Sequence, residues 1–235
     1  MSGMQQPAEA ASTGANMTAG TGRPGGVDAP DLESLDATAV LAHAVGRFQP
    51  RIALACSFQK EESVLVHMLS TSAPKTRIFT LDTGVLFAAT RDNWRTLEGR
   101  YDTIVEAVDA TPGDGSPPWT ADRCCAGRKV EALLGMLSGL DAWITGVRRD
   151  QSPARADARK LAWDARNGLW KVNPLADWTD RDVWAYITAH DIPYNALHDQ
   201  GYASIGCEPC TTPGSDREGR WSGRDRTECG LHADR

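Results

Sequence analysis

The sequence predicts an α/β fold, a parallel twisted sheet with helices on both faces. Short apolar runs of strand length alternate with longer stretches whose apolar residues recur every three or four positions, which indicates βαβ units. Polar loops follow the apolar runs, and the carboxyl ends of parallel strands meet at one edge of a sheet, where ligands bind. We therefore expect a ligand pocket at that edge.

Composition and length suit one soluble α/β domain. The chain has 235 residues, of which 41% are hydrophobic and 24% charged. It contains neither an apolar run of roughly 18 residues nor a signal peptide, so we expect a cytoplasmic protein that does not bind a membrane. The net charge of −6 argues against binding of nucleic acid. The sequence does not determine the oligomeric state, and a homo-oligomer is one of the possible states.

Three regions differ in composition. Residues 1–30 contain almost no large apolar side chain and are predicted to form a disordered leader. Residues 31–213 hold the alternating pattern of the α/β domain. Residues 214–235 offer little to form a core, so they are predicted to form a mobile C-terminal tail.

The domain is expected to begin with a helical pattern over Leu32–Phe48, followed by a buried strand at Arg51–Cys56. The polar turn Ser57–Ser63 then leads into a helix. Such a turn favours anions, because the backbone N–H groups at a helix N-terminus have no partner. It lacks the glycines and lysine of a P-loop, and many βα units without an anion site look similar.

Later elements follow the same alternation. Strands are expected at Arg77–Leu81, Thr103–Val108 and Asp141–Val147, with a helix at Phe87–Leu97. Asn167-Gly168 predicts a hairpin, and Thr179 with Asp182 predicts a capping box for a helix that ends near His190. The loops Ser57–Glu62, Asp82–Gly84 and Gly146–Gln151 would then share one sheet edge and form a nucleotide pocket.

Four cysteines occur in two pairs. Cys124 and Cys125 are adjacent at the start of a helical run, and Cys207 and Cys210 are separated by two residues. A disulfide between neighbours is strained, and two buried structural thiols would explain the pairing less well. The pattern favours one soft metal centre, and the residue types alone suit zinc or an iron–sulfur cluster.

Another cysteine, Cys229, lies in the tail. Four arginines precede it, and cations stabilise a thiolate and make it nucleophilic; they are Arg217, Arg220, Arg224 and Arg226. Asp225 and Glu228 would oppose this effect, and an incidental thiol on a solvated tail is the alternative. Cys56 is predicted to be a small buried strand residue.

The chain resembles the thioredoxin-dependent assimilatory adenylyl-sulfate (APS) reductases. These are relatives of the phosphoadenylyl-sulfate (PAPS) reductases and share the adenine nucleotide alpha-hydrolase-like, or ATP-pyrophosphatase-like, fold. The matching segments are Ala55–Leu65, Leu81–Gly84, Cys124–Val130, Thr145–Ser152, Cys207–Pro213, Gly219–Trp221 and Glu228–His232. One departure is Ser222–Arg224, which replaces an aromatic and acidic stretch and leaves the orientation of Arg224 and Arg226 open.

The resemblance implies a reaction and its groups. APS would be reduced to sulfite and AMP in sulfate assimilation for cysteine biosynthesis, through a Cys229 S-sulfonate that thioredoxin or a glutaredoxin-like reductant resolves. One 4Fe–4S cluster per chain would be held by Cys124, Cys125, Cys207 and Cys210. The implied substrate-binding residues are Ser57, Leu81, Asp82, Gly84, Lys129, Gly146, Arg148, Arg217, Arg220 and His232.

Three alternatives remain. A PAPS reductase shares the sheet and the Glu-Cys-Gly-Leu-His ending but usually lacks the two cysteine pairs. An ATP-using thiolation or synthetase-type enzyme would need a Ser-Gly-Gly-x-Asp-Ser-type loop where Phe58-Gln-Lys60 stands. A zinc-stabilised binding module would leave Cys229 and its arginines without a role.

Overall fold

The computed structural model describes residues 30–111 and 127–221. Its elements, in chain order, are α1 (Ala37–Phe48), β1 (Ile52–Ala55), α2 (Lys60–Ser72), β2 (Arg77–Asp82), α3 (Ala88–Tyr101), β3 (Val105–Asp109), α5 (Lys129–Leu137), β4 (Ala142–Ile144), η2 (Arg149–Gln151), η3 (Pro153–Arg155), β5 (Leu161–Asp164), β6 (Leu169–Val172), α6 (Asp180–Ala189), η4 (Ala196–Gln200) and η5 (Glu208–Cys210). Within these ranges, no helix is long and apolar enough to cross a membrane.

The strands form one sheet in the order β3-β2-β1-β4-β6-β5. Four neighbouring pairs are parallel; in the centre, Leu54 of β1 lies beside Ile78 of β2 and Ile144 of β4. The hairpin predicted at Asn167-Gly168 joins β5 to β6, and this pair is antiparallel. The predicted fold class is confirmed, with β5 as an antiparallel edge strand.

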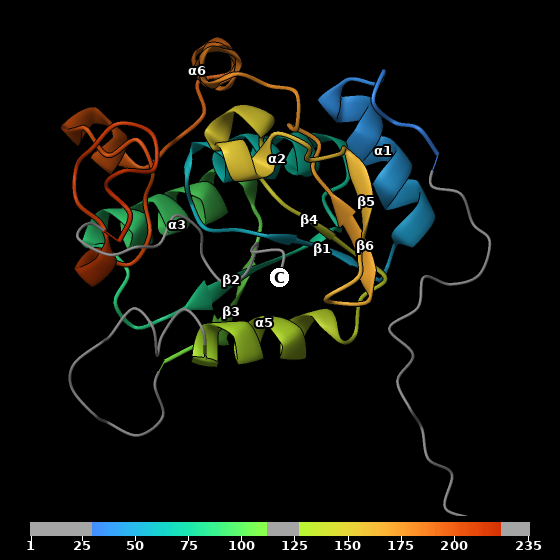
Figure 1. Cartoon of the computed structure of the whole chain (residues 1–235), viewed down its shortest axis with the longest axis horizontal. Helices are drawn as coiled ribbons and strands as arrows, with labels where there is room; N and C mark the ends of the chain where they lie inside the picture. Colours follow the sequence, from blue (N-terminus) through green and yellow to red (C-terminus); the bar gives the residue numbers. More distant parts are fainter. Residues whose placement is uncertain (1–29, 112–126, 222–235) are drawn as a thin grey trace, which may run out of the picture.

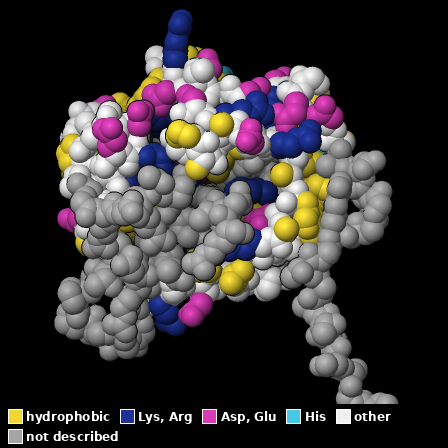
Figure 2. Space-filling view, in the orientation of Figure 1, with side chains coloured by type: hydrophobic (Ala, Val, Ile, Leu, Met, Phe, Trp, Pro, Cys, Tyr) yellow, Lys and Arg dark blue, Asp and Glu magenta, His cyan; other side chains and the backbone are white. Residues whose placement is uncertain are grey.

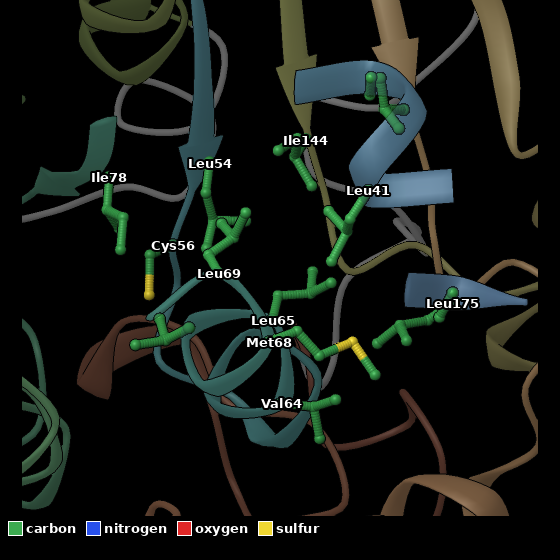
Figure 3. Close-up of a cluster of buried hydrophobic side chains, with 14 of the residues drawn as sticks. Leu41, Leu54, Cys56, Val64, Leu65, Met68, Leu69, Ile78, Ile144 and Leu175 are labelled. Carbon is green, nitrogen blue, oxygen red and sulfur yellow. The ribbon is translucent and has the colours of Figure 1, made fainter. Parts of the chain in front are cut away.

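Helices cover both faces of the sheet (Figure 1). Helices α1, α2, α3 and α6 lie on one side, and α5 lies on the other. On the first side, Leu65 and Leu69 of α2 pack toward Leu54 and Ile144 in the larger core (Figure 3). Leu133 of α5 belongs to a smaller cluster on the other side. Burial of these apolar stripes fixes the sheet between two helical layers.

Local capping signals set two helix starts. Helix α1 begins at Ala37, later than the predicted Leu32, because the side chain of Asp36 accepts a hydrogen bond from the Ala39 N–H at 2.8 Å. The predicted capping box of α6 is present, with reciprocal hydrogen bonds between Thr179 and Asp182.

The chain after α6 folds back beside the β2–α3 connection. Glu208 N–H bonds the Val85 carbonyl at 2.9 Å, and Trp221 N–H bonds the Cys210 carbonyl at 2.9 Å. Trp221 is 2% exposed. Residues 214–221, which the sequence assigned to the tail, therefore pack on the body of the protein, and the rest of that tail lies outside the described residues.

Candidate active site

A pocket opens at the carboxyl ends of β1, β2 and β4 and encloses about 990 Å³, including solvent at its mouth. Lys and Arg side chains reach the surface in the hollow at the middle of this face (Figure 2). Six of the predicted substrate-binding residues line this pocket: Ser57, Leu81, Lys129, Gly146, Arg217 and Arg220. Asp82, Gly84 and Arg148 are not part of the lining, and His232 lies outside the described residues.

The β1–α2 turn carries a buried acidic pair at the helix N-terminus. Ser57 Oγ donates to Glu62 Oε2 at 2.9 Å and accepts a hydrogen bond from Gln59 Nε2 at 3.3 Å. Glu61 and Glu62 are 4% and 7% exposed. At the helix N-terminus where the sequence predicts an anion site, the structure thus places the protein's own carboxylates.

The pKa of Glu62 is raised to about 7. Burial is the largest cause and the charge of Glu61 the second, while hydrogen bonds from Ser57 and from the backbone of Glu62 and Gln59 lower the pKa. Burial, followed by the charge of Glu62, raises the pKa of the Cys56 thiol. Cys56, 4% exposed at the end of β1, is therefore a poor thiolate nucleophile.

The side chains of Glu61 and Glu62 leave room only for a glycine at position 146. A Cβ atom at this position would lie 2.5 Å from Oε1 of Glu62 and 2.8 Å from Cβ of Glu61. Only a glycine lets the chain after β4 pass this close to the first turn of α2.

Arg148 is buried behind the pocket wall and forms ion pairs with several carboxylates. Its guanidinium donates to Oε1 of Glu61 at 2.9 Å and to Oδ1 of Asp180 at 3.1 Å, and it also pairs with Asp150. The side chain is 4% exposed. Arg148 therefore ties the loop after β4 to α2 and α6, and its charge is balanced by these carboxylates.

Asp82 and Gly84 shape the loop after β2. Asp82 accepts a hydrogen bond from Gly84 N–H at 2.9 Å and pairs with Arg91 at 3.2 Å. Gly84 has φ of +73°, which favours glycine. Both residues fix the backbone beside Leu81, which lines the pocket.

Two arginines of the C-terminal segment face the pocket. Arg220 Nη1 donates to the Ile205 carbonyl at 2.9 Å, and its guanidinium lies 4.6 Å from the Trp221 ring centroid. The guanidinium of Arg217 lies 5.7 Å from the same ring. Trp221 thus orients both cations, while Lys129 adds a third positive group from the N-terminus of α5.

Cys207 precedes the short turn η5, and Cys210 is its last residue. The Cys207 side chain lines the pocket, and its Sγ lies 3.2 Å from the Thr83 hydroxyl. Two thiols presented by one tight turn are suitable ligands for a soft metal, so the described half of the predicted ligand set fits a cluster or zinc. Cys124, Cys125 and Cys229 lie outside the described residues, and no group of three or more candidate metal ligands occurs within those residues.

The sequence places Glu62 and Thr83 within the predicted pocket loops Ser57–Glu62 and Asp82–Gly84, but it assigns neither residue a role. A signal for Glu62 is present: two adjacent carboxylates open a helix directly after a buried strand. Thr83 lies within the segment Leu81–Gly84, but its contact with Cys207 joins residues 124 positions apart and depends on the tertiary fold.

Comparisons with known proteins agree on one family. Residues 51–213 match the model of the phosphoadenosine phosphosulfate reductase domain. An adenosine 5′-phosphosulfate reductase of Salinibacter ruber is 45% identical over 83% of this chain and 82% of its own length. A phosphoadenosine 5′-phosphosulfate reductase of Gloeobacter violaceus is 42% identical, over 86% and 90% of the two chains. The adenosine 5′-phosphosulfate reductase 2 of Bacillus subtilis is 41% identical, over 84% and 90%.

Solved structures share the fold. The phosphoadenylyl-sulfate reductase of Candida auris, in a phosphate complex, superimposes with a TM-score of 0.65 at 27% identity, covering 77% of this chain and 92% of that chain. The FMN adenylyltransferase of Candida glabrata, in complex with FAD and pyrophosphate, gives a TM-score of 0.59 at 16% identity, covering 76% and 64%. The second likeness concerns the fold alone.

Proposed function

Because this chain belongs to the phosphoadenosine phosphosulfate reductase family, we propose that it reduces adenosine 5′-phosphosulfate to sulfite and AMP for sulfate assimilation. The observation that carries the proposal is the pocket itself. It brings Lys129, Arg217 and Arg220 together with Cys207 at the carboxyl edge of the sheet. Cations beside a pair of soft ligands suit a substrate that carries a phosphate and a sulfate.

The alternative substrate carries a further phosphate on the ribose. Relatives named for either substrate are similar to this chain, so family membership alone does not choose between the two. The two cysteine pairs favour APS, as the sequence predicts. A comparison of turnover with both nucleotides at low concentration distinguishes the two, and higher efficiency with PAPS would contradict the assignment.

In the proposed reaction, the thiolate of Cys229 attacks the sulfur of APS. A sulfur–sulfur bond forms, the sulfur–oxygen bond to the phosphate breaks, and AMP leaves with the bonding electron pair. A dithiol reductant such as thioredoxin then attacks the sulfur of Cys229 and releases sulfite. Its second thiol resolves the mixed disulfide and restores the Cys229 thiolate, so two electrons come from the reductant.

In this proposal, Arg217 and Arg220 stabilise the negative charge of the leaving group. As AMP leaves, negative charge grows on the phosphate oxygen, and Arg217 and Arg220, which stack on Trp221 and line the pocket, are proposed to neutralise it. Fixed cations require little reorganisation during the reaction. The reducing cytoplasm suits a mechanism that depends on free thiols and a dithiol reductant.

Cys207 and Cys210, together with Cys124 and Cys125, are proposed to hold one 4Fe–4S cluster per chain. When bound, such a cluster would supply a redox-active, charged group beside the pocket. Protein purified anaerobically should contain about four irons and four sulfides per chain, as a four-thiolate cubane requires. Stoichiometric zinc without acid-labile sulfide would contradict the cluster and favour the zinc alternative.

Detection of the covalent Cys229 S-sulfonate intermediate tests the proposed function. Incubation with APS in the absence of reductant should add one sulfonate to the chain, which peptide mass spectrometry should locate at Cys229. Thioredoxin should remove it with release of sulfite. Cys229→Ser should form no adduct, whereas the control Cys56→Ser should retain it, because the Cys56 thiol is buried with a raised pKa. An adduct on another cysteine would refute the mechanism.

A further inference from the structure

The side chain of Gln59 connects the β1–α2 turn to the C-terminal part of the chain. Its Oε1 accepts a hydrogen bond from the backbone N–H of Ile205 at 2.8 Å and another from the Ser204 hydroxyl at 3.2 Å. The bond to Ile205 joins residues that are 146 positions apart in the sequence. Because a backbone N–H can only donate, the amide oxygen of Gln59 must face Ile205. The proposed reaction gives this amide no role.

Arg220 is held by the same two residues. Its Nη1 donates to the Ile205 carbonyl at 2.9 Å and to the Ser204 hydroxyl at 3.3 Å. The guanidinium also packs against the backbone of Gly206, where a Cβ atom would lie 2.6 Å from the Arg220 Cζ. Ser204 and Ile205 therefore accept hydrogen bonds from Arg220 while they donate hydrogen bonds to Gln59.

These hydrogen bonds form one chain with a single direction. A guanidinium can only donate, so the Ser204 hydroxyl accepts from Arg220 and gives its own proton to Gln59. The Gln59 Nε2 then donates to the Ser57 hydroxyl at 3.3 Å, and Ser57 donates to Glu62 Oε2 at 2.9 Å. The chain thus runs from a cation of the pocket to a buried carboxyl group, with the amide of Gln59 at its centre.

A long cationic side chain stabilises a transition state best when it is fixed beforehand. The arginine side chain can adopt many rotamers, and a cation that has to move during the reaction loses part of its stabilising effect. Arg220 and Gln59 both line the pocket. The bonds through Ser204 and Ile205 hold the guanidinium of Arg220 at one place relative to the β1–α2 turn.

We propose that Gln59 is a positioning residue of the reaction, which acts through Ser204 and Ile205 to hold Arg220 where negative charge grows on the leaving AMP. This inference rests on the proposed function, because the charge arises only when the sulfur–oxygen bond of the substrate breaks. A residue that only stabilises the fold would slow the reaction independently of Arg220. A positioning residue has little effect once the Arg220 guanidinium is removed.

The experiment is a double-mutant cycle on the rate of S-sulfonate formation at Cys229, measured in a single turnover of the cluster-loaded full chain at saturating APS. Gln59→Met keeps the length of the side chain but removes the amide, and it should slow this step by about tenfold. Arg220→Met should slow it by about a hundredfold. In the Arg220→Met protein, the added Gln59→Met substitution should slow it further by less than about twofold.

The matched control is Asn195→Leu, which also removes an amide without shortening the side chain. Asn195 is buried, and its Nδ2 joins distant segments by donating to the Thr90 hydroxyl at 2.9 Å. Its substitution should slow the reaction by the same factor, whatever the size of that factor, with and without the Arg220 guanidinium. Ser204→Ala interrupts the chain from the other end and should show the same dependence on Arg220 as Gln59→Met, so it carries the test if Gln59→Met does not fold.

Hydrogen exchange provides a second measurement that needs no substrate. The peptide that contains Ile205 should exchange faster in Gln59→Met than in the wild type, because its N–H loses its acceptor. Rate factors that multiply in the double variant, or an unchanged exchange rate in folded Gln59→Met, would overturn the inference alone. A wild type that forms no S-sulfonate with APS would overturn the proposed function as well.

Discussion

At the scale of single residues, Glu62 links stability to pH. Its pKa is about 7 in the folded protein and 4.5 ordinarily, so the folded state holds the proton more tightly than the unfolded state. Stability contributed by the protonated group is therefore present below pH 4.5 and is lost as the pH rises through 7. The full difference is on the order of 3 kcal/mol.

Glu62→Gln should remove this pH dependence. At pH 5 the wild-type carboxyl is protonated, and the amide should change the free energy of unfolding little. At pH 8 the wild type buries a charge next to Glu61, so the variant should be the more stable protein. Urea unfolding at both pH values measures the difference, with Glu106→Gln as the control. An equal effect of the Glu62 substitution at both pH values would contradict the assigned pKa.

At the scale of elements, helix α6 depends on its capping box. Thr179→Ala removes the hydroxyl that accepts the Asp182 N–H, and it should cost about 1 kcal/mol of unfolding free energy. Thr188→Ala is the control on the same helix, because Thr188 is exposed and its hydroxyl bonds only the Trp184 carbonyl among the described contacts. Chemical denaturation compares the two variants. If Thr179→Ala lowers the free energy of unfolding no more than Thr188→Ala does, the capping box does not stabilise α6.

Elements were predictable where their signals are local. The capping box at Thr179, the hairpin at Asn167-Gly168 and the apolar strand before Ser57 each follow from a few neighbouring residues, and the structure confirms them. The start of α1 was placed too early because Leu32 is apolar and buried but precedes the cap at Asp36.

The site was predictable only in part. The resemblance implied Ser57, Leu81 and Gly146, and they meet at the pocket because Leu81 lies near the carboxyl end of β2 while Ser57 and Gly146 follow β1 and β4. The role of Arg148 could not be inferred from the sequence, because its ion pairs with Glu61 and Asp180 form between distant segments. Periodicity reports which face of an element is buried, but it does not say which charges meet there.

At the scale of the whole molecule, the predicted leader should be dispensable. Residues 1–30 have little apolar content to dock on a core, whereas Asp31 and Glu33 pair with Arg159 at the start of the described domain. A chain that begins at Asp31 should therefore keep its turnover and its melting temperature. Differential scanning fluorimetry and a sulfite assay check this, and a loss of several degrees would show that the leader packs on the domain.

The buried Trp221 also limits how far Cys229, the proposed nucleophile, can travel. Its ring lies under two arginines and its N–H bonds the Cys210 carbonyl, so the chain is anchored at this residue. Cys229 follows eight residues later, and a fully extended chain of that length spans at most about 29 Å. The proposed nucleophile is thus tethered to the domain, with a local concentration on the order of millimolar whatever the concentration of the enzyme.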